Sequence, residues 1–156
     1  MSPLQIFDIL VFMTITICAS ISFYKDVIDI KNQLVEIGFT VIMPHLAEIM
    51  EQENDFDRES QLAKRRIVNP EGHKTEAIMM HFRKIEKCDA ILVVNRKKNG
   101  IGGYIGGNVL MEMGIAFYLQ KKIYILNKIS KKEPFTEEIF GMQPVVLKGS
   151  IDSMLH

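Results

Sequence analysis

The chain has 156 residues, of which 47% are apolar and 24% are charged, and this composition suits one domain with one hydrophobic core. Its 19 basic and 19 acidic side chains balance, which argues against nucleic acid or a membrane surface as the main partner, because either favours a basic excess. The two cysteines, Cys18 and Cys88, lack metal-ligand spacing, so we expect reduced thiols with packing roles in the cytoplasm.

Residues 1–12 precede the first predicted strand, and we interpret them as an N-terminal extension to a single domain over residues 13–156. Residues 9–23 are rich in apolar side chains, but threonines and serines interrupt them. This stretch is shorter than the roughly 20 apolar residues of a membrane-spanning helix, and it lacks the basic start of a signal peptide. We therefore expect no association with a membrane.

The first part of the domain has the pattern of a strand, a helix and a second strand. Residues 14–19 are β-branched and compact, as in a buried strand. Residues 25–37 carry apolar side chains at helical spacing, and Gly38 follows as a C-cap. Residues 39–43 form the next predicted strand, which Pro44 ends. A helix between two strands at this pitch predicts a parallel sheet.

Residues 47–74 interrupt this alternation. Their first half is strongly acidic, and a basic cluster follows at residues 64–66. One interpretation is a solvated excursion from the sheet. The other is a mobile lid over a functional site, in which Arg65 or Arg66 meets an anionic substrate.

The second part of the domain alternates between helices and strands again. The predicted helices span residues 75–87, 109–120 and 134–140, and the predicted strands span residues 90–94, 122–126 and 145–147. Five strands that alternate with helices predict an α/β fold, with a doubly wound parallel sheet of flavodoxin-like order 2-1-3-4-5 and helices on both faces. Ligands of such sheets bind at the carboxyl ends of the strands, near the switch point.

A glycine-rich loop precedes the helix predicted over residues 109–120. It has five glycines between Gly100 and Gly107, which allow close backbone approach and leave N–H groups free to bind a ligand. The sequence lacks the Walker A pattern, and Ile105 stands where a dinucleotide fingerprint needs its third glycine. Two interpretations remain: a nest for an anion or a sugar at a helix N-terminus, or a purely structural turn.

Glu112 is the first candidate for chemistry. Asn108 suits the N-cap of the predicted helix, and Glu112 then falls one residue beyond the place of a capping-box glutamate. It shares a helix face with Asn108, Val109 and Ala116, and we expect that face to pack towards the sheet. An unpaired carboxylate is costly there, so Glu112 is either an acid paired in the core or a residue that meets a ligand.

His81 and Asp89 both precede the third predicted strand. His81 lies on the apolar face of its helix, and its ordinary pKa of about 6.5 suits proton transfer near neutrality. A histidine that simply packs in the core is the alternative. Asp89 opens the strand, where we favour a turn residue over a functional one.

Three stretches carry a family resemblance: residues 16–22, residues 81–94, and residues 106–116 with the strand that follows. The third reads Glu-Met-Gly-Ile-Ala from Glu112. Together they resemble the nucleoside 2-deoxyribosyltransferase family, including its 2'-deoxynucleoside 5'-phosphate N-hydrolase branch, whose helix motif is Glu-Leu-Gly-x-Ala. The similarity covers most of residues 13–150.

The resemblance implies roles for the two candidates. Because the family's helix glutamate is its nucleophile, we expect Glu112 to attack the anomeric carbon and form a covalent glycosyl ester. The family places an aspartate eight residues before the one that opens the third strand, and His81 stands there. An imidazolium is a competent acid, so we expect His81 to protonate the leaving base. The family's first-strand tyrosine has no counterpart; Thr16 lies near its place, and Tyr104 is a candidate substitute.

The resemblance also implies how the substrate is held. The expected substrate-binding residues are Ser20, Ile21, Ser22, Gly103, Gly106, Asn108, Asp89 and Met142. We expect a homodimer or higher homo-oligomer, in which Phe140 and Met142 of a neighbour complete the pocket, although ordinary core packing of these two residues fits equally well. We expect neither a cofactor nor a metal ion, since no cluster of histidine, cysteine and aspartate has ligand spacing.

The expected function is cleavage or transfer of the N-glycosidic bond of a nucleoside or a nucleoside 5'-monophosphate. Hydrolysis and transfer differ in whether water or a second base attacks the intermediate, and the sequence leaves this open. The preference for a 5'-phosphate is also open, because Ser22 stands where the phosphate-preferring branch has an arginine. The alternative is a nucleotide-binding or sensing module without turnover, which His81 favours and Glu112 disfavours.

Overall fold

The computed structural model describes residues 13–155, so the expected N-terminal extension over residues 1–12 lies outside the described residues. The described chain folds around one sheet whose five strands are all parallel. In space their order is β2-β1-β3-β4-β5, which confirms the predicted flavodoxin-like α/β fold. The strands are β1 (Thr14–Ala19), β2 (Thr40–Ile42), β3 (Ala90–Val94), β4 (Lys122–Ile125) and β5 (Val145–Val146).

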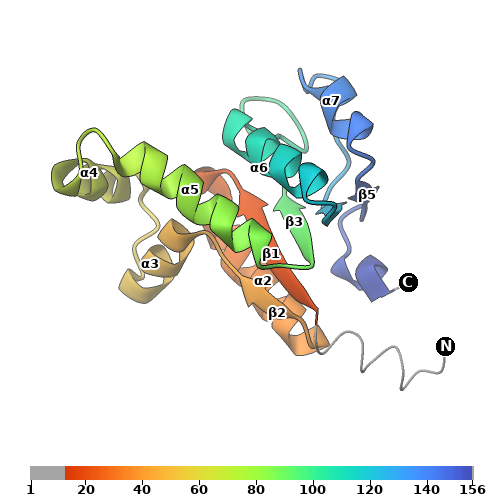
Figure 1. Ribbon diagram of the computed structural model, residues 1–156, viewed down its shortest axis with the longest axis horizontal. Coiled ribbons are helices and arrows are strands. Elements are labelled where there is room, and N and C mark those ends of the chain that lie inside the picture. The colour runs from red at the N-terminus through yellow and green to blue at the C-terminus, as the bar shows by residue number, and fades with distance from the viewer. Residues whose placement is uncertain (1–12, 156) are drawn as a thin grey trace.

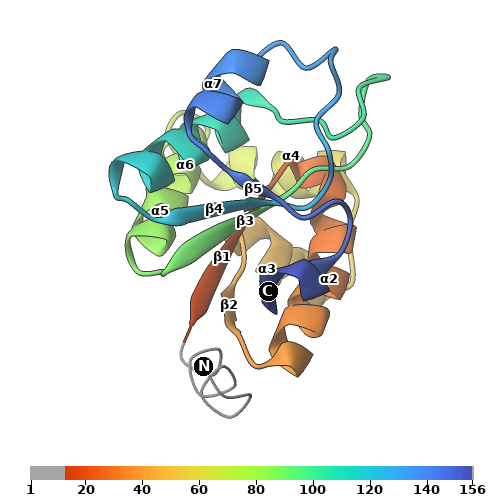
Figure 2. The same ribbon diagram turned by 90° about the vertical axis from the view of Figure 1, so that its right-hand side faces the viewer.

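Helices cover both faces of the sheet, as Figure 2 shows. The helices are α2 (Tyr24–Ile37), α3 (His45–Glu53), α4 (Arg58–Val68), α5 (His73–Glu86), α6 (Gly107–Tyr118) and α7 (Thr136–Gly141), with short 3-10 turns η1 (Ile21–Phe23) and η2 (Ile151–Leu155). The hydrophobic core on one face joins the sheet to α2, α3 and η2, and the core on the other face joins it to α5, α6 and α7.

Strand β1 shows how the two cores divide. Ile15 and Ile17 point to the face of α2, whereas Cys18 points to the face of α5 and α6. Thr16 lies on that second face too, where its Oγ1 donates a hydrogen bond to the Lys84 carbonyl oxygen of α5. Cys18 lies near the carboxyl end of β1. Because side chains alternate along a strand, Cys18 points to the face that α5 and α6 cover.

Residues 47–74, for which the sequence left a solvated excursion and a lid as alternatives, are mostly helical. Helix α3 begins directly after Pro44, and Asp57 caps α4 by accepting a hydrogen bond from the Ser60 N–H. Helix α4 lies outside the two layers, at one end of the molecule beside the start of α5 (Figure 1). This segment therefore adds a short wall to the domain at the end where α5 begins.

The other elements match their predicted places to within about two residues, as expected for helix and strand ends. Gly38 ends α2 in the left-handed region, with φ 110°, which confirms the predicted C-cap. Within residues 13–155, no helix is both long enough and apolar enough to cross a membrane.

Candidate active site

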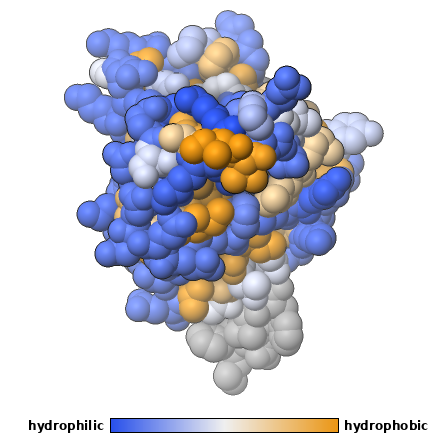
Figure 3. Space-filling model, turned by 90° about the vertical axis from the view of Figure 1, so that its left-hand side faces the viewer, coloured by the Kyte–Doolittle hydropathy of each residue, from blue (hydrophilic) through white to orange (hydrophobic). Residues whose placement is uncertain are grey.

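A cavity of about 460 Å³ opens at the carboxyl ends of β1 and β3, where ligands of doubly wound sheets bind. Its walls come from the end of β1, the starts of α3 and α6, helix α4 and the first turns of α5. Figure 3 shows the side of the molecule that carries α4 and α5, where apolar patches interrupt a mostly polar surface. Residues 47–74 thus provide part of the cavity wall.

Glu112 reaches this cavity from α6. The helix buries Val109, Met113 and Ala116 against the sheet, and Glu112 lies beside this face with its side chain 16% exposed. Its Oε2 atom is buried without a hydrogen-bond partner. The acid is therefore not turned to bulk water, and one of its two oxygens lacks a hydrogen-bond partner, which is the position expected of a residue that meets a ligand.

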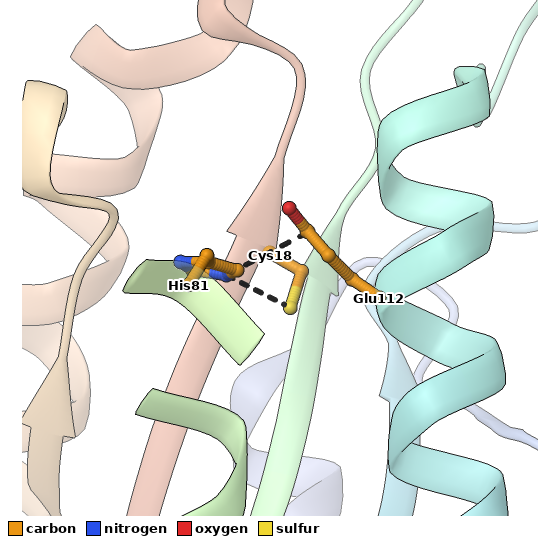
Figure 4. Close-up of side chains that lie close together, drawn as sticks. All are labelled: Cys18, His81 and Glu112. Carbon is orange, nitrogen blue, oxygen red and sulfur yellow. Dashed lines mark hydrogen bonds and ion pairs between the residues drawn. The ribbon is translucent and has the colours of Figure 1, made fainter. Parts of the chain in front are cut away.

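His81 and Cys18 lie next to Glu112, as Figure 4 shows. The Nε2 atom of His81 is 3.6 Å from Oε2 of Glu112 and 3.4 Å from the Sγ atom of Cys18. These three side chains come from α5, α6 and β1. The contact between His81 and Glu112 is too long for an N–H···O hydrogen bond, as catalytic contacts often are before a ligand binds.

Burial sets the charge of the pair. It raises the pKa of Glu112 to about 8, against the opposing effects of Cys18 and Lys74. It also lowers the pKa of His81 to about 4, and the charge of Lys84 acts in the same direction. Between pH 4 and pH 8 the pair shares one proton. Burial favours the arrangement in which Glu112 holds this proton, because both groups are then uncharged. Glu112 and His81 are therefore two neutral neighbours at neutral pH, not a fixed ion pair.

The thiol and phenol around Glu112 stay protonated. Burial, followed by the negative charge of Glu112, raises the pKa of Cys18 well above its usual value. The same two causes raise the pKa of Tyr24, which lines the cavity at the start of α2. Tyr104, the candidate substitute for the family's first-strand tyrosine, lines the same cavity as Tyr24. The hydroxyl of Thr16 is instead bound to α5.

Cationic side chains surround the mouth of the cavity. The residues are Arg58, Arg65, Arg66, Lys74 and Lys98. Lys74 donates a hydrogen bond to Oδ1 of Asn108 at 3.1 Å, which links α5 to α6. Lys98 donates to Oγ of Ser20 at 3.1 Å and lies 5.2 Å from the ring centroid of Tyr104. Such a rim attracts an anionic ligand.

The structure brings together part of the predicted site. Ser20, Ile21, Gly106 and Asn108 line the same cavity as His81 and Glu112. Asn108, however, is not the N-cap: α6 begins two residues earlier than predicted, with Gly106 in the cap position. Gly106 is extended there and forms no side-chain cap, so the first turn of α6 is open towards the cavity.

The other four predicted substrate residues lie outside the cavity lining. Asp89 lies at the opposite end of β3, where its Oδ2 accepts a hydrogen bond from the Thr14 N–H at 2.7 Å. This supports the turn interpretation. Ser22 is exposed in η1, and Met142 borders a separate surface hollow near the end of α6. Gly103 has φ 66°, and a Cβ there would lie 2.1 Å from the Lys128 carbonyl oxygen, so its role is structural.

Several residues of this site were not predicted from the sequence. Cys18 was predicted to pack in the core, because it has no neighbouring ligand in the sequence. Through space, Cys18, His81 and Glu112 place one potential ligand atom each within 4.8 Å of one another. Tyr24, Lys74 and Lys98 were also missed. Lys98 follows the third strand by four residues, and that place at a carboxyl edge was a usable signal.

The scan against models of protein families finds no match to this chain. No curated protein matches it either. The function of the cavity is therefore inferred from its own geometry and from the residue pattern around Glu112.

Proposed function

We propose that this protein cleaves or exchanges the N-glycosidic bond of a nucleoside or a nucleoside 5'-monophosphate, with Glu112 as its nucleophile. One observation carries the proposal: the carboxyl group of Glu112 is largely buried, lacks a hydrogen-bond partner at Oε2, and still lines an open cavity. The cavity volume of about 460 Å³ falls in the range that holds small organic ligands. The pattern around Glu112, which resembles the deoxyribosyltransferases, supports the same chemistry.

The proposed reaction has two steps. A carboxylate oxygen of Glu112 attacks the anomeric carbon, an ester bond forms, and the C–N bond to the base breaks. The base leaves with the electron pair of that bond and takes a proton from His81. Water or a second base then attacks the same carbon and gives its proton to His81, the ester breaks, and the Glu112 carboxylate is released. Two displacements at one carbon retain its configuration.

The productive arrangement differs from the resting one by a single proton. With both groups uncharged, the proton is on Glu112, whereas attack requires it on His81. Movement of that proton across the 3.6 Å between Nε2 and Oε2 generates the nucleophile and the acid in one event. The cationic rim, and Lys74 in particular, lowers the cost of a carboxylate at position 112.

The test is release of free base by the purified full chain from a panel of nucleosides, deoxynucleosides and their monophosphates. We expect Glu112→Gln to reduce release at least roughly 10³-fold, as for loss of a catalytic nucleophile. Glu138→Gln on α7, an exposed acid away from the cavity, is the matched control and should not change it. Unchanged release by Glu112→Gln overturns the proposed role.

A second measurement identifies the intermediate and the acceptor. Acid-quenched reactions should contain a peptide that carries the sugar as an ester on Glu112, detected by mass spectrometry. When a second base is added, a new nucleoside indicates transfer, whereas only free base and free sugar indicate hydrolysis.

A nucleotide-binding module without turnover is the second candidate, and one observation favours it. Burial lowers the pKa of His81 to about 4, which makes it a weakly populated acid, while the cationic rim suits an anionic ligand. This candidate predicts saturable binding of monophosphates with no release of base in the same panel.

A further inference from the structure

Cys18, His81 and Glu112 form a cluster of three different donor groups that the proposed reaction uses only in part. A thiol, an imidazole and a carboxyl group converge from β1, α5 and α6 (Figure 4), and two of them, on His81 and Glu112, line the cavity. Their potential ligand atoms all lie within 4.8 Å of one another. Because the three residues are far apart in sequence, no ligand spacing marks this cluster.

Two of the three distances within the cluster fit a small tetrahedral ion. With ordinary Zn–S, Zn–N and Zn–O bond lengths, tetrahedral ligand atoms lie roughly 3.3–3.6 Å apart. Here Sγ of Cys18 lies 3.4 Å from Nε2 of His81, and that nitrogen lies 3.6 Å from Oε2 of Glu112. The cluster therefore needs adjustments of only a few tenths of an ångström along these two edges.

We propose that Cys18, His81 and Glu112 bind one zinc ion, with its fourth position open to the cavity. The donor set selects this metal, because thiolate and imidazole suit zinc, whereas magnesium and calcium require oxygen ligands. Three protein ligands with one open position form an accessible zinc site, not a closed structural one. A water molecule or an anion from the cavity would complete the coordination.

Two further features of the cluster favour a cation. Oε2 of Glu112 is a buried acceptor without a hydrogen-bond partner, and a metal ion would satisfy it. Cys18 is fully buried and its thiol contacts His81, so the sulfur is shielded from bulk water. When zinc binds, the thiol and the carboxyl group each release a proton to solvent, and the dication replaces them.

Zinc in this position would switch off the proposed glycosidic chemistry, a consequence that rests on the proposed function. The ion would bind the carboxylate oxygen that attacks the sugar and the ring nitrogen that protonates the base. Neither atom would then be free to react. Binding itself depends only on the geometry of the three side chains, so the two proposals can fail separately.

Cobalt titration of the full chain tests the site, because a thiolate bound to Co²⁺ gives a charge-transfer absorption band that nitrogen and oxygen ligands do not give. After removal of metals with a chelator, we expect one Co²⁺ per chain, with this band, and displacement of the ion by one Zn²⁺. Cys18→Ala should abolish the band, and Cys88→Ala, at the other buried cysteine, should keep it.

The other two ligands have their own variants. Glu112→Gln and His81→Ala should each weaken cobalt binding at least tenfold, whereas His73→Ala, which changes a cavity histidine outside the cluster, should not. Absence of the band in the unaltered chain, or its persistence in Cys18→Ala, overturns the proposal. If Cys18→Ala fails to fold, Glu112→Gln and His81→Ala still decide the test.

Base release measured on metal-free protein separates this proposal from the catalytic one. Release that stops with one equivalent of Zn²⁺ and returns with chelator supports both. Cobalt binding without any base release retains the metal site and rejects the glycosidic activity. Base release without cobalt binding retains the glycosidic activity and rejects the metal site.

Discussion

The Nε2 atom of His81 lies 3.6 Å from Oε2 of Glu112, and this contact joins α5 to α6 at the carboxyl edge of the sheet. Burial acts on both groups, but in opposite directions: the pKa of the acid rises to about 8 and that of the base falls to about 4. A protein gains no stability from this arrangement. Side chains kept at such a cost are typical of functional sites.

Glu112→Gln should stabilise the protein at neutral pH. The unfolded chain ionises Glu112 near pH 4.5, and the folded chain near pH 8. Below pH 4.5 the folded and the unfolded chain both hold this proton, so ionisation of Glu112 does not change the free energy of unfolding. As pH rises from 4.5 to 8, only the unfolded state releases it, so the wild type loses roughly 1.4 kcal/mol per pH unit relative to the variant. Denaturant unfolding at several pH values, with chelator present, measures this difference.

The glutamine must show a gain that grows with pH and levels off above about pH 8. Glu138→Gln, whose carboxyl group is exposed, is the control and should show no such trend. Equal stability of the Glu112→Gln variant and the wild type at pH 4 and pH 8 would contradict the raised pKa. It would mean that the acid is well solvated or paired in the folded protein.

The fold was predictable because local patterns decided it. Residues 14–19 and 90–94 are apolar runs of strand length, residues 25–37 have an apolar face of helical spacing, and Gly38 supplies the left-handed end of α2. Helix α4 was missed because it packs outside both layers and buries only Gln61 fully. Most of its residues are charged or polar, and such a composition is typical of a solvated segment.

The site was predictable in its parts but not in its assembly. Glu112 and His81 were recognisable as polar groups on apolar helix faces, but their contact depends on how α5 and α6 pack together, which periodicity does not specify. Cys18 illustrates the same limit. Alternation places it opposite Ile17, but the sequence does not tell which face of the sheet receives α5. The start of α6 was misplaced because Gly106 caps it through the backbone alone.

His81→Asp should keep base release and change its pH profile if His81 supplies the proton. A carboxyl group at this position stands next to Glu112, and the like charges of two ionised acids oppose each other, so one of them holds the proton to higher pH. The measurement is kcat/KM for base release between pH 4 and pH 9. Release that disappears while the variant still melts cooperatively would reject the acid role. Loss of the fold itself would favour a core histidine.

Arg65→Gln should weaken the binding of nucleoside monophosphates more than that of nucleosides. Arg65 lines the cavity from α4, and an arginine–phosphate pair contributes a charge-assisted hydrogen bond that an uncharged sugar cannot form. We expect KM for monophosphates to rise about tenfold, for a loss of about 1.4 kcal/mol. Arg83→Gln, exposed on α5, is the matched control. Equal effects on nucleosides and monophosphates would reject a phosphate contact.

Gly103→Ala should destabilise the protein, because this glycine supports the loop that carries Tyr104 to the cavity. Its φ of 66° disfavours any side chain, and a Cβ would lie 2.1 Å from the Lys128 carbonyl oxygen. Left-handed strain and displacement of that backbone together should cost about 2 kcal/mol or more.

The control is Gly107→Ala at the first turn of α6, where a Cβ meets nothing within 4 Å and alanine favours the helix. Thermal melts of the two variants should therefore diverge, with Gly103→Ala unfolding several degrees below the wild type and Gly107→Ala close to it. Equal melting temperatures would show that the loop relaxes around a methyl group and that its glycine is not structural.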